Sequence, residues 1–269
     1  MKHTITLILT LCLLLSLLAI GASAENSTSA SVELSTAYVT IAVKGELAAV
    51  QIAVILEDCD GDGSITVNDA LYAAHQKAYE GGAETGYGFY TSDYGLSMSK
   101  LWGDESGAYG YYLNNASCMS LADPVKNGDY ITAFVYASSD WSDVYTYFDV
   151  STKTVEVGEE ITLTLMAAGY DENWTPITYP VEGATVTFEG RKTGFVTDAE
   201  GKVTISPEAT GTHIYSAVHD GMTIVPPVCS ITTVKAEIPE EEKGCGAIVG
   251  SAIALATLLG CVMIKRKEN

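Results

Sequence analysis

Carboxylates recur at alternate positions in the segment DCDGDGSITVND, residues 58–69. Asp58, Asp60 and Asp62 occupy its first, third and fifth positions, and Asp69 occupies the twelfth. A hard cation such as Ca²⁺ prefers several oxygen ligands, and alternate residues of a coiling loop can point inward together. Carboxylates this close repel one another unless a cation neutralises them. The spacing therefore predicts a calcium site.

The same spacing resembles the twelve-residue calcium loop of EF-hands and dockerins, with Gly63 at the sixth position, where the chain bends. The predicted ligands are Asp58, Asp60, Asp62, the backbone carbonyl of Ser64, Thr66 through its hydroxyl or a bound water, and Asp69. The alternative is an Asx-rich turn that leads into a helix and needs no metal. The sequence contains no second loop of this kind, so we expect an affinity at the weak extracellular end of the range.

The elements around this loop have clear sequence signals. Thr66 is a good helix N-cap, and Asp69 three positions later completes a capping box. Apolar residues then recur at helical spacing until Gly81 and Gly82 end the helix. Residues 32–43 are β-rich, residues 44–46 read as a turn, and residues 49–56 alternate and are mostly β-branched, which predicts a hairpin of two strands. Further short strands are expected at 88–90, 109–113, 130–136 and 145–148. The expected order is strand, calcium loop, helix.

A second candidate site consists of aromatic and amide side chains that follow the helix. Its members are Trp102, Tyr109, Tyr111, Tyr112, Asn114 and Asn115. Aromatic faces among glycines can form a platform for a sugar, a corrinoid or a peptide, and the two amides can direct the ligand. The alternative is that the tyrosines are buried strand residues and that the asparagines form a turn.

Charge and motifs exclude several functions. The chain has a formal net charge of −20, which repels nucleic acid and anionic lipid and attracts divalent cations. No nucleophile elbow, zinc-protease motif or phosphate loop occurs, so we expect no enzyme activity. Three cysteines, Cys59, Cys118 and Cys229, lie outside the predicted signal and membrane segments. Either Cys59 pairs with Cys118 or all three are free thiols.

Both ends of the chain carry targeting signals. Residues 1–24 have a basic start, an apolar run and a small-residue cleavage site, which predicts a secretory signal peptide. Residues 25–31 are expected to be a disordered lead-in. Residues 244–264 form an apolar span after an acidic stalk at 236–243. The basic tail at 265–269 belongs in the cytoplasm by the positive-inside rule. We therefore expect a single-pass cell-membrane protein whose N-terminal bulk is extracellular.

The order of stalk, Gly244-Cys245-Gly246, apolar span and basic tail is similar to the C-terminal sorting signals of Gram-positive surface proteins. No LPxTG motif is present, so wall attachment has no support. A retained single-span anchor is the expectation. Cleavage or lipid modification at Cys245 is the alternative.

Four segments resemble the domain-of-unknown-function family related to the C-terminal domain of transcobalamin. They are VNDAL at 67–71, residues 96–102, YGYYLNN at 109–115 and KNGDYI at 126–131. The resemblance covers residues 32–150 and implies a β-grasp-like α+β domain. In transcobalamin this domain covers one side of a bound corrinoid. The present chain departs from that pattern by its acidic metal loop and lacks the large helical partner domain.

Residues 154–235 alternate with period two between glycine-rich turns, which predicts a β-sandwich. The segments PVEGATVT at 180–187 and TDAEGKVT at 197–204 resemble bacterial Ig-like and transthyretin-like surface repeats. The predicted fold is thus mainly β: a β-grasp-like domain, an Ig-like sandwich and one C-terminal transmembrane helix.

Two functions agree with these features. The first is a membrane-anchored, calcium-binding surface protein that presents a non-catalytic module to an unidentified small-molecule or glycan ligand, alone or with a second surface protein that completes the site. The alternative is a calcium-stabilised adhesion or structural protein. An aromatic-lined pocket favours the first reading.

Overall fold

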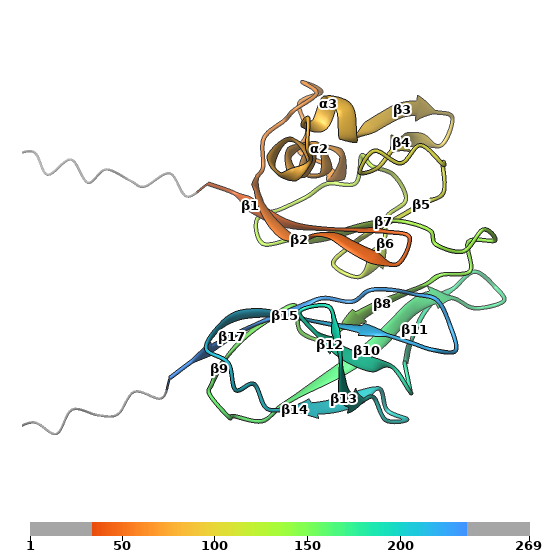
Figure 1. Ribbon diagram of the computed structural model, residues 1–269. Helices are drawn as coiled ribbons and strands as arrows, with labels where there is room; N and C mark the ends of the chain where they lie inside the picture. The colour runs from red at the N-terminus through yellow and green to blue at the C-terminus, as the bar shows by residue number, and fades with distance from the viewer. Residues whose placement is uncertain (1–33, 236–269) are drawn as a thin grey trace, which may run out of the picture. The chain divides into compact units, whose positions relative to one another are not determined.

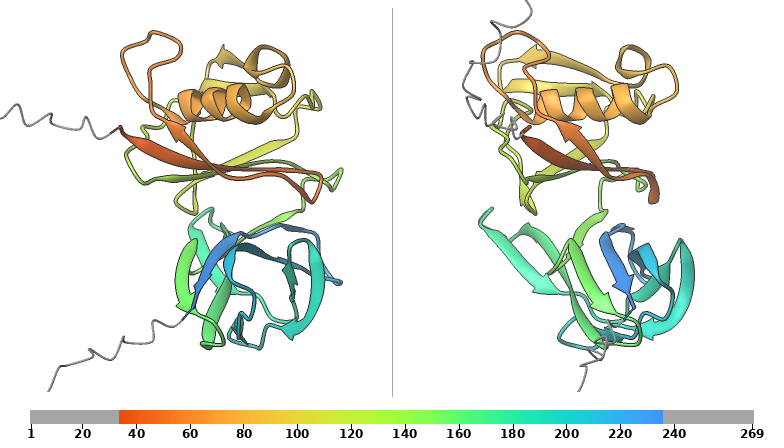
Figure 2. Two further views of the ribbon diagram at one scale, coloured as in Figure 1. Left: turned by 60° about the vertical axis from the view of Figure 1, so that its left-hand side comes forward. Right: turned by 90° about the vertical axis from the view of Figure 1, so that its left-hand side faces the viewer.

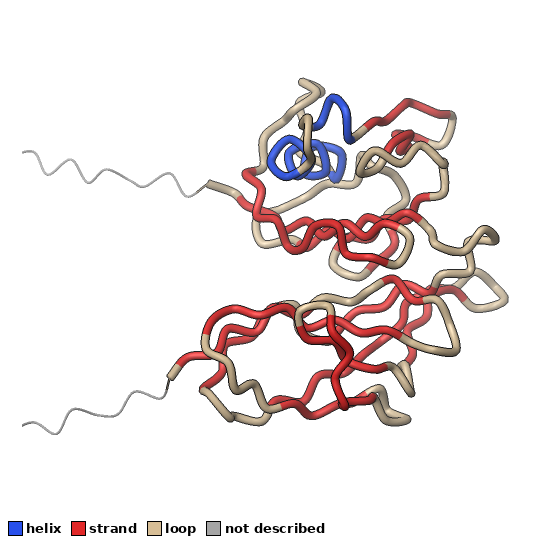
Figure 3. The backbone as a smooth tube through the Cα atoms, in the orientation of Figure 1, coloured by secondary structure: helices blue, strands red, loops and turns tan. Residues whose placement is uncertain are grey.

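The computed structural model describes residues 34–235 and is mainly β, as the sequence predicts (Figure 3). Residues 34–234 group into one compact unit. The predicted signal peptide, lead-in, stalk, membrane span and basic tail lie outside the described residues. None of the helices in the described part of the chain is long and apolar enough to cross a membrane.

The N-terminal region, residues 34–143, is built on one five-stranded sheet with the order β2-β1-β7-β5-β6 (Figure 1). Its strands are β1 (Thr36–Val43), β2 (Glu46–Ile55), β5 (Tyr109–Leu113), β6 (Ala116–Ser117) and β7 (Tyr130–Val135). The predicted hairpin of the first two strands is confirmed, with Lys44 and Gly45 at positive φ in its turn. β1 also pairs in parallel with β7, from Tyr38↔Tyr130 to Val43↔Val135.

Two helices and a hairpin complete this region. They are α2 (Val67–Ala78), α3 (Ala83–Gly86), β3 (Gly88–Ser92) and β4 (Gly95–Lys100). α2 lies against one face of the sheet, above β1 and β2 (Figure 2). Its apolar side packs there because Val67, Leu71 and Ala74 recur at helical spacing and are fully buried. The order of strand, loop and helix is confirmed, although α2 ends at Ala78, before the predicted stop at Gly81.

The C-terminal region, residues 144–235, contains two five-stranded sheets. The first is formed by β8 (Val144–Phe148), β10 (Ile161–Tyr170), β11 (Pro176–Pro180), β14 (Lys202–Ile205) and β16 (Ile224–Val225). The second is formed by β9 (Thr152–Glu156), β12 (Thr185–Phe188), β13 (Arg191–Val196), β15 (Gly211–Val218) and β17 (Cys229–Val234). Alternate residues of β10, such as Leu163 and Leu165, are fully buried, as the period-two pattern requires.

The change from one set of sheets to the next occurs earlier than the expected boundary near residue 150. β8 pairs with β10 and β16, so this strand joins the C-terminal sheets rather than the sheet of β1. A small third cluster of buried residues contains Ala42, Phe134, Tyr145 and Val225 and so includes side chains from both regions. Local periodicity identifies β8 as a strand, but its partners depend on contacts distant in sequence.

Candidate functional site

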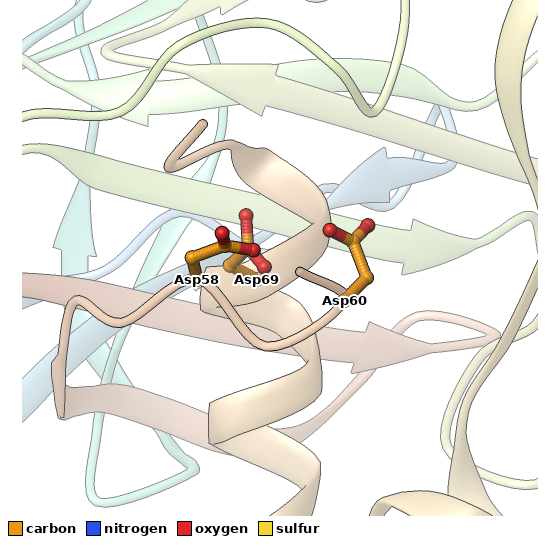
Figure 4. A group of neighbouring side chains, drawn as sticks. All are labelled: Asp58, Asp60 and Asp69. Carbon is orange, nitrogen blue, oxygen red and sulfur yellow. The ribbon is translucent and has the colours of Figure 1, made fainter. Parts of the chain in front are cut away.

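Three of the predicted calcium ligands converge at the junction of the 56–66 loop with α2. Asp58, Asp60 and Asp69 each offer a carboxylate oxygen, and these atoms lie within 4.8 Å of one another. Figure 4 shows Asp58 and Asp60 on the loop, with Asp69 on the first turn of the helix. The four ion pairs recorded in the described residues all lie elsewhere, so no basic side chain neutralises this group there. Its geometry is suited to a cation with oxygen ligands.

Backbone N–H groups hold Asp58. Its Oδ1 accepts hydrogen bonds from Gly61 N (2.7 Å) and Asp62 N (3.2 Å), and its Oδ2 accepts one from Gly63 N (2.9 Å). Gly61 and Gly63 have φ values of 76° and 88°, which favour glycine. The hydrogen bond from Gly63 is the largest of the effects that lower the pKa of Asp58, so this carboxylate stays ionised.

Asp69 connects the start of the loop to the start of the helix. Its Oδ1 accepts a hydrogen bond from Cys59 N, and its Oδ2 accepts one from Thr66 N and another from the Thr66 hydroxyl, all at 2.8 Å. The side chain is only 1% exposed. The predicted N-cap at Thr66 is confirmed. A buried carboxylate at this position fixes the loop relative to α2, whatever else binds it.

A hydrogen-bonded chain through the core orients Asp60. Asn68 is 1% exposed; its Nδ2 donates to Asp60 Oδ2 (3.0 Å), and its Oδ1 accepts from the Tyr87 hydroxyl (2.9 Å). Burial raises the pKa of Asp60, and the neighbouring Asp69 and Asp62 carboxylates add to the shift. Sequence reasoning missed Asn68 and Tyr87, because Tyr87 belongs to the segment after α3 and reaches Asn68 only through the fold.

The other predicted ligands have different roles in the structure. Asp62 lies in the loop but outside the converging trio, and its Oδ1 accepts a hydrogen bond from Ser64 N at 2.8 Å. The Thr66 hydroxyl donates to Asp69 and is buried. Asp58, Asp60 and Asp69 therefore form the core of the candidate site.

All three cysteines of the described residues are free, so the alternative of a bridge between Cys59 and Cys118 is wrong for this structure. Burial raises the pKa of Cys59, and the Asp69 carboxylate adds to this effect. Burial also raises the pKa of Cys118 and of Cys229 to about 12. These thiols are therefore protonated and weakly reactive at neutral pH.

The predicted aromatic platform divides between two places. Trp102, Tyr109 and Tyr111 pack against the core beneath α2. The Trp102 ring lies 5.1 Å from Tyr79, edge to face, and the Tyr109 hydroxyl donates to Asp104 O at 2.7 Å. Tyr112 belongs instead to the third cluster and stacks on Tyr145 at 3.6 Å.

The two asparagines form the turn between β5 and β6, at φ values of 50° and 66°. Asn114 donates to Asp129 Oδ1 at 2.8 Å and accepts from Tyr130 N at 2.9 Å, so its amide is engaged within the protein. Asn115 Oδ1 accepts from the Tyr145 hydroxyl at 2.9 Å. The six predicted ligand residues thus do not share one surface.

His75 is fully buried beside the N-terminal core. Its Nδ1 lies 2.7 Å from Leu71 O, and its Nε2 accepts a hydrogen bond from Trp102 N at 3.0 Å. The neutral tautomer with a proton on Nδ1 satisfies both contacts. Burial lowers the pKa of His75 to about 4, so the imidazole is neutral at physiological pH. From the sequence, His75 is expected to be a surface residue of the helix, and its full burial shows that this expectation is wrong.

Comparison of the chain with known protein families, curated proteins and solved structures gives no match.

Proposed function

We propose that this protein is a non-catalytic surface protein, held at the cell membrane by a single span, in which one calcium ion stabilises the N-terminal region. The observation that carries the proposal is the convergence of the Asp58, Asp60 and Asp69 carboxylates without a basic partner among the described residues. A bound cation would offset their mutual repulsion and fasten the loop to α2.

The packing of the aromatic residues favours a structural or adhesive role over a small-ligand module at Trp102, Tyr109 and Tyr111, because these rings contact the core. The proposal keeps the expected membrane topology, with the N-terminal bulk outside the cell. In it, the N-terminal region is a β-grasp-like domain of the transcobalamin C-terminal type, and the C-terminal region is an Ig-like spacer. A corrinoid ligand stays a prediction, because the six predicted ligand residues do not form one platform that would support it.

Calcium-dependent thermal unfolding tests the metal site. A ligand that binds only the native state stabilises it by about 2.7 kcal/mol at a hundredfold excess over Kd. Millimolar calcium should therefore raise the melting temperature. The double variant Asp60→Ala/Asp62→Ala should lose this response, whereas Asp140→Ala/Asp171→Ala, which removes the same charge elsewhere, should keep it. An equal calcium response in both double variants would exclude the loop as the site.

Protease treatment of intact cells tests the topology. The proposal predicts that external protease degrades residues 34–235, because this part lies outside the membrane. Survival of the full-length chain, while a known surface protein of the same cells is digested, would contradict it.

A further inference from the structure

A groove with a volume of about 290 Å³ lies between the β5–β6 turn and the β10–β11 hairpin. Its lining includes Tyr112, Asn115, Ser117, Tyr170, Ile177 and Thr178. No charged side chain lines it, although the whole chain has a net charge of −20. The groove should therefore favour a neutral ligand. It has no charged side chain to pair with an ionic ligand, and it lacks the carboxylates that repel anions elsewhere on the surface.

Aromatic rings form part of the lining, and one of them is held in place by stacking. Tyr112 stacks on Tyr145 with ring centroids 3.6 Å apart and planes 6° apart, so only its other face and its edge are available to the groove. Tyr170 is 43% exposed, and its ring lies 6.1 Å from the ring of Trp174, which is 81% exposed. Aromatic side chains have few rotatable bonds, so these rings supply contact area at low entropic cost.

Hydrogen-bonding groups stand beside these rings without partners in the described chain. The Tyr145 hydroxyl donates to Asn115 Oδ1, which leaves the amide NH₂ of Asn115 as a donor for a ligand. The structure records no hydrogen bond for the hydroxyls of Ser117, Tyr170 or Thr178. The groove thus combines ring faces with neutral donors and acceptors.

The turn that carries Trp174 is well ordered by its own hydrogen bonds. Asp171 Oδ1 accepts from Asn173 N and Thr175 N, both at 2.8 Å, and Asp171 N donates to Thr175 O at 2.9 Å. The exposed indole is therefore presented from a fixed backbone. Trp174 extends the aromatic surface beyond the groove, next to Tyr170.

We propose that this groove binds a short segment of a neutral oligosaccharide. Ring faces suit the C–H surfaces of sugars, and the amide and hydroxyl groups suit sugar hydroxyls. The volume is at the lower limit of the roughly 300–1,000 Å³ of pockets that enclose drug-sized ligands, which is too small for a corrinoid.

An added peptide strand fits less well. The edge strand β11 begins at Pro176 and ends at Pro180, and neither residue has an N–H to donate to a new strand. The inference goes beyond the proposed calcium-stabilised role and does not depend on the ion, because the groove shares no residue with the loop at 58–69.

Saturation-transfer NMR on the purified full-length protein tests the inference, with cellohexaose, maltohexaose and chitohexaose as probes and a heparin hexasaccharide as the anionic control. Partly open sites of this size bind weakly, so we expect a Kd between about 0.1 and 5 mM for at least one neutral probe. The substitution Tyr170→Ala should weaken this binding about tenfold or more. Tyr179→Ala, an exposed tyrosine on the same hairpin outside the groove, should change it less than about twofold.

Three results would overturn the inference: no binding of any neutral probe at about 10 mM, binding of heparin alone, or equal loss in Tyr170→Ala and Tyr179→Ala. The Asp60→Ala/Asp62→Ala protein should bind the neutral probe as the wild type does. Glycan binding without a calcium response would therefore contradict the proposed calcium site but support the glycan groove. A calcium response without glycan binding would contradict the groove alone.

Discussion

The N-terminal and C-terminal regions both enclose hydrophobic cores, but they bury different polar groups. Residues 34–143 bury Asn68, Asp69 and His75, together with hydroxyls. Residues 144–235 bury only hydroxyls among their polar side chains, on Thr146, Thr187, Thr197, Ser216 and Thr233. A buried amide or ionisable group is stable only with its partners in place and in the right charge state. The stability of the N-terminal region should therefore depend more strongly on pH and on cations than that of the C-terminal region.

Two acidic turns illustrate the same difference. Asp58 and Asp171 both accept hydrogen bonds from backbone N–H groups of their own turns. Asp171 lies outside the recorded cluster of candidate metal ligands, and hydrogen bonds from the backbone of its own turn satisfy its carboxylate. Asp58 meets the carboxylates of Asp60 and Asp69. The common device is an Asx turn, and the additional carboxylates are what make one turn a candidate cation site.

The largest expected effect is the loss of a core side chain in the C-terminal region, which sets the baseline for the comparison. Leu165 is fully buried there. Leu165→Ala should lower the free energy of unfolding by about 2 to 5 kcal/mol, from lost burial and a residual cavity. Urea unfolding should give the same loss with and without calcium and at pH 7 and pH 5. If the loss of unfolding free energy in Leu165→Ala varies with calcium, the C-terminal region is not independent of the calcium site.

Acid should destabilise the protein through His75. The folded pKa is lowered to about 4 from 6.5, so the unfolded chain takes up the proton first as the pH falls. The free energy of unfolding should therefore decrease between about pH 6.5 and 4, by about 3 kcal/mol in total. The rings of Tyr79, Tyr87 and Trp102 face the imidazole, and none of them carries a charge that would offset this cost.

Comparison of two variants isolates that effect. His75→Gln should flatten the pH dependence of urea unfolding in this window, because the variant lacks the imidazole whose pKa burial lowers across it. Tyr215→Phe, which changes a mostly buried side chain of the C-terminal region and removes no imidazole, should leave the slope as in the wild type. Equal slopes in the wild type and in His75→Gln would show that other groups cause the acid response.

A smaller effect is expected from Tyr87→Phe, which removes the hydroxyl that orients Asn68. The loss of one buried hydrogen bond should cost about 1 kcal/mol in urea unfolding without calcium. Because Asn68 also holds Asp60, calcium affinity should fall severalfold as well. Tyr215→Phe, a mostly buried tyrosine of the C-terminal region, is the control and should leave calcium affinity unchanged. Unaltered affinity in Tyr87→Phe would limit the network to a structural role.

The sequence predicts the local elements of this protein well. The turn at Lys44 and Gly45, the helix start at Thr66 and the turn at Asn114 and Asn115 each depend on residues close together in the chain. The strand expected at Tyr109–Leu113 is present with the same bounds. These signals are short-range, so tertiary contacts do not override them.

Longer-range features could not be predicted in this way. The parallel pairing of β1 with β7 joins residues about ninety positions apart, and no periodicity specifies it. β4 was not expected as a strand, because its sequence GLSMSK has little β-branched character. Likewise, the aromatic residues alternate along β5, so Tyr111 and Tyr112 face opposite sides of the sheet. A single platform therefore could not form from neighbouring tyrosines.

A calcium titration followed by amide NMR shifts tests the central claim most directly. The amides of Gly61 and Gly63 donate to Asp58 and should report any ion bound there. We predict shifts at these two amides that saturate at one calcium per chain, while the amides of Asn173 and Thr175 in the Asp171 turn do not move. Unchanged Gly61 and Gly63 resonances at millimolar calcium, or equal shifts in both turns, would contradict the account.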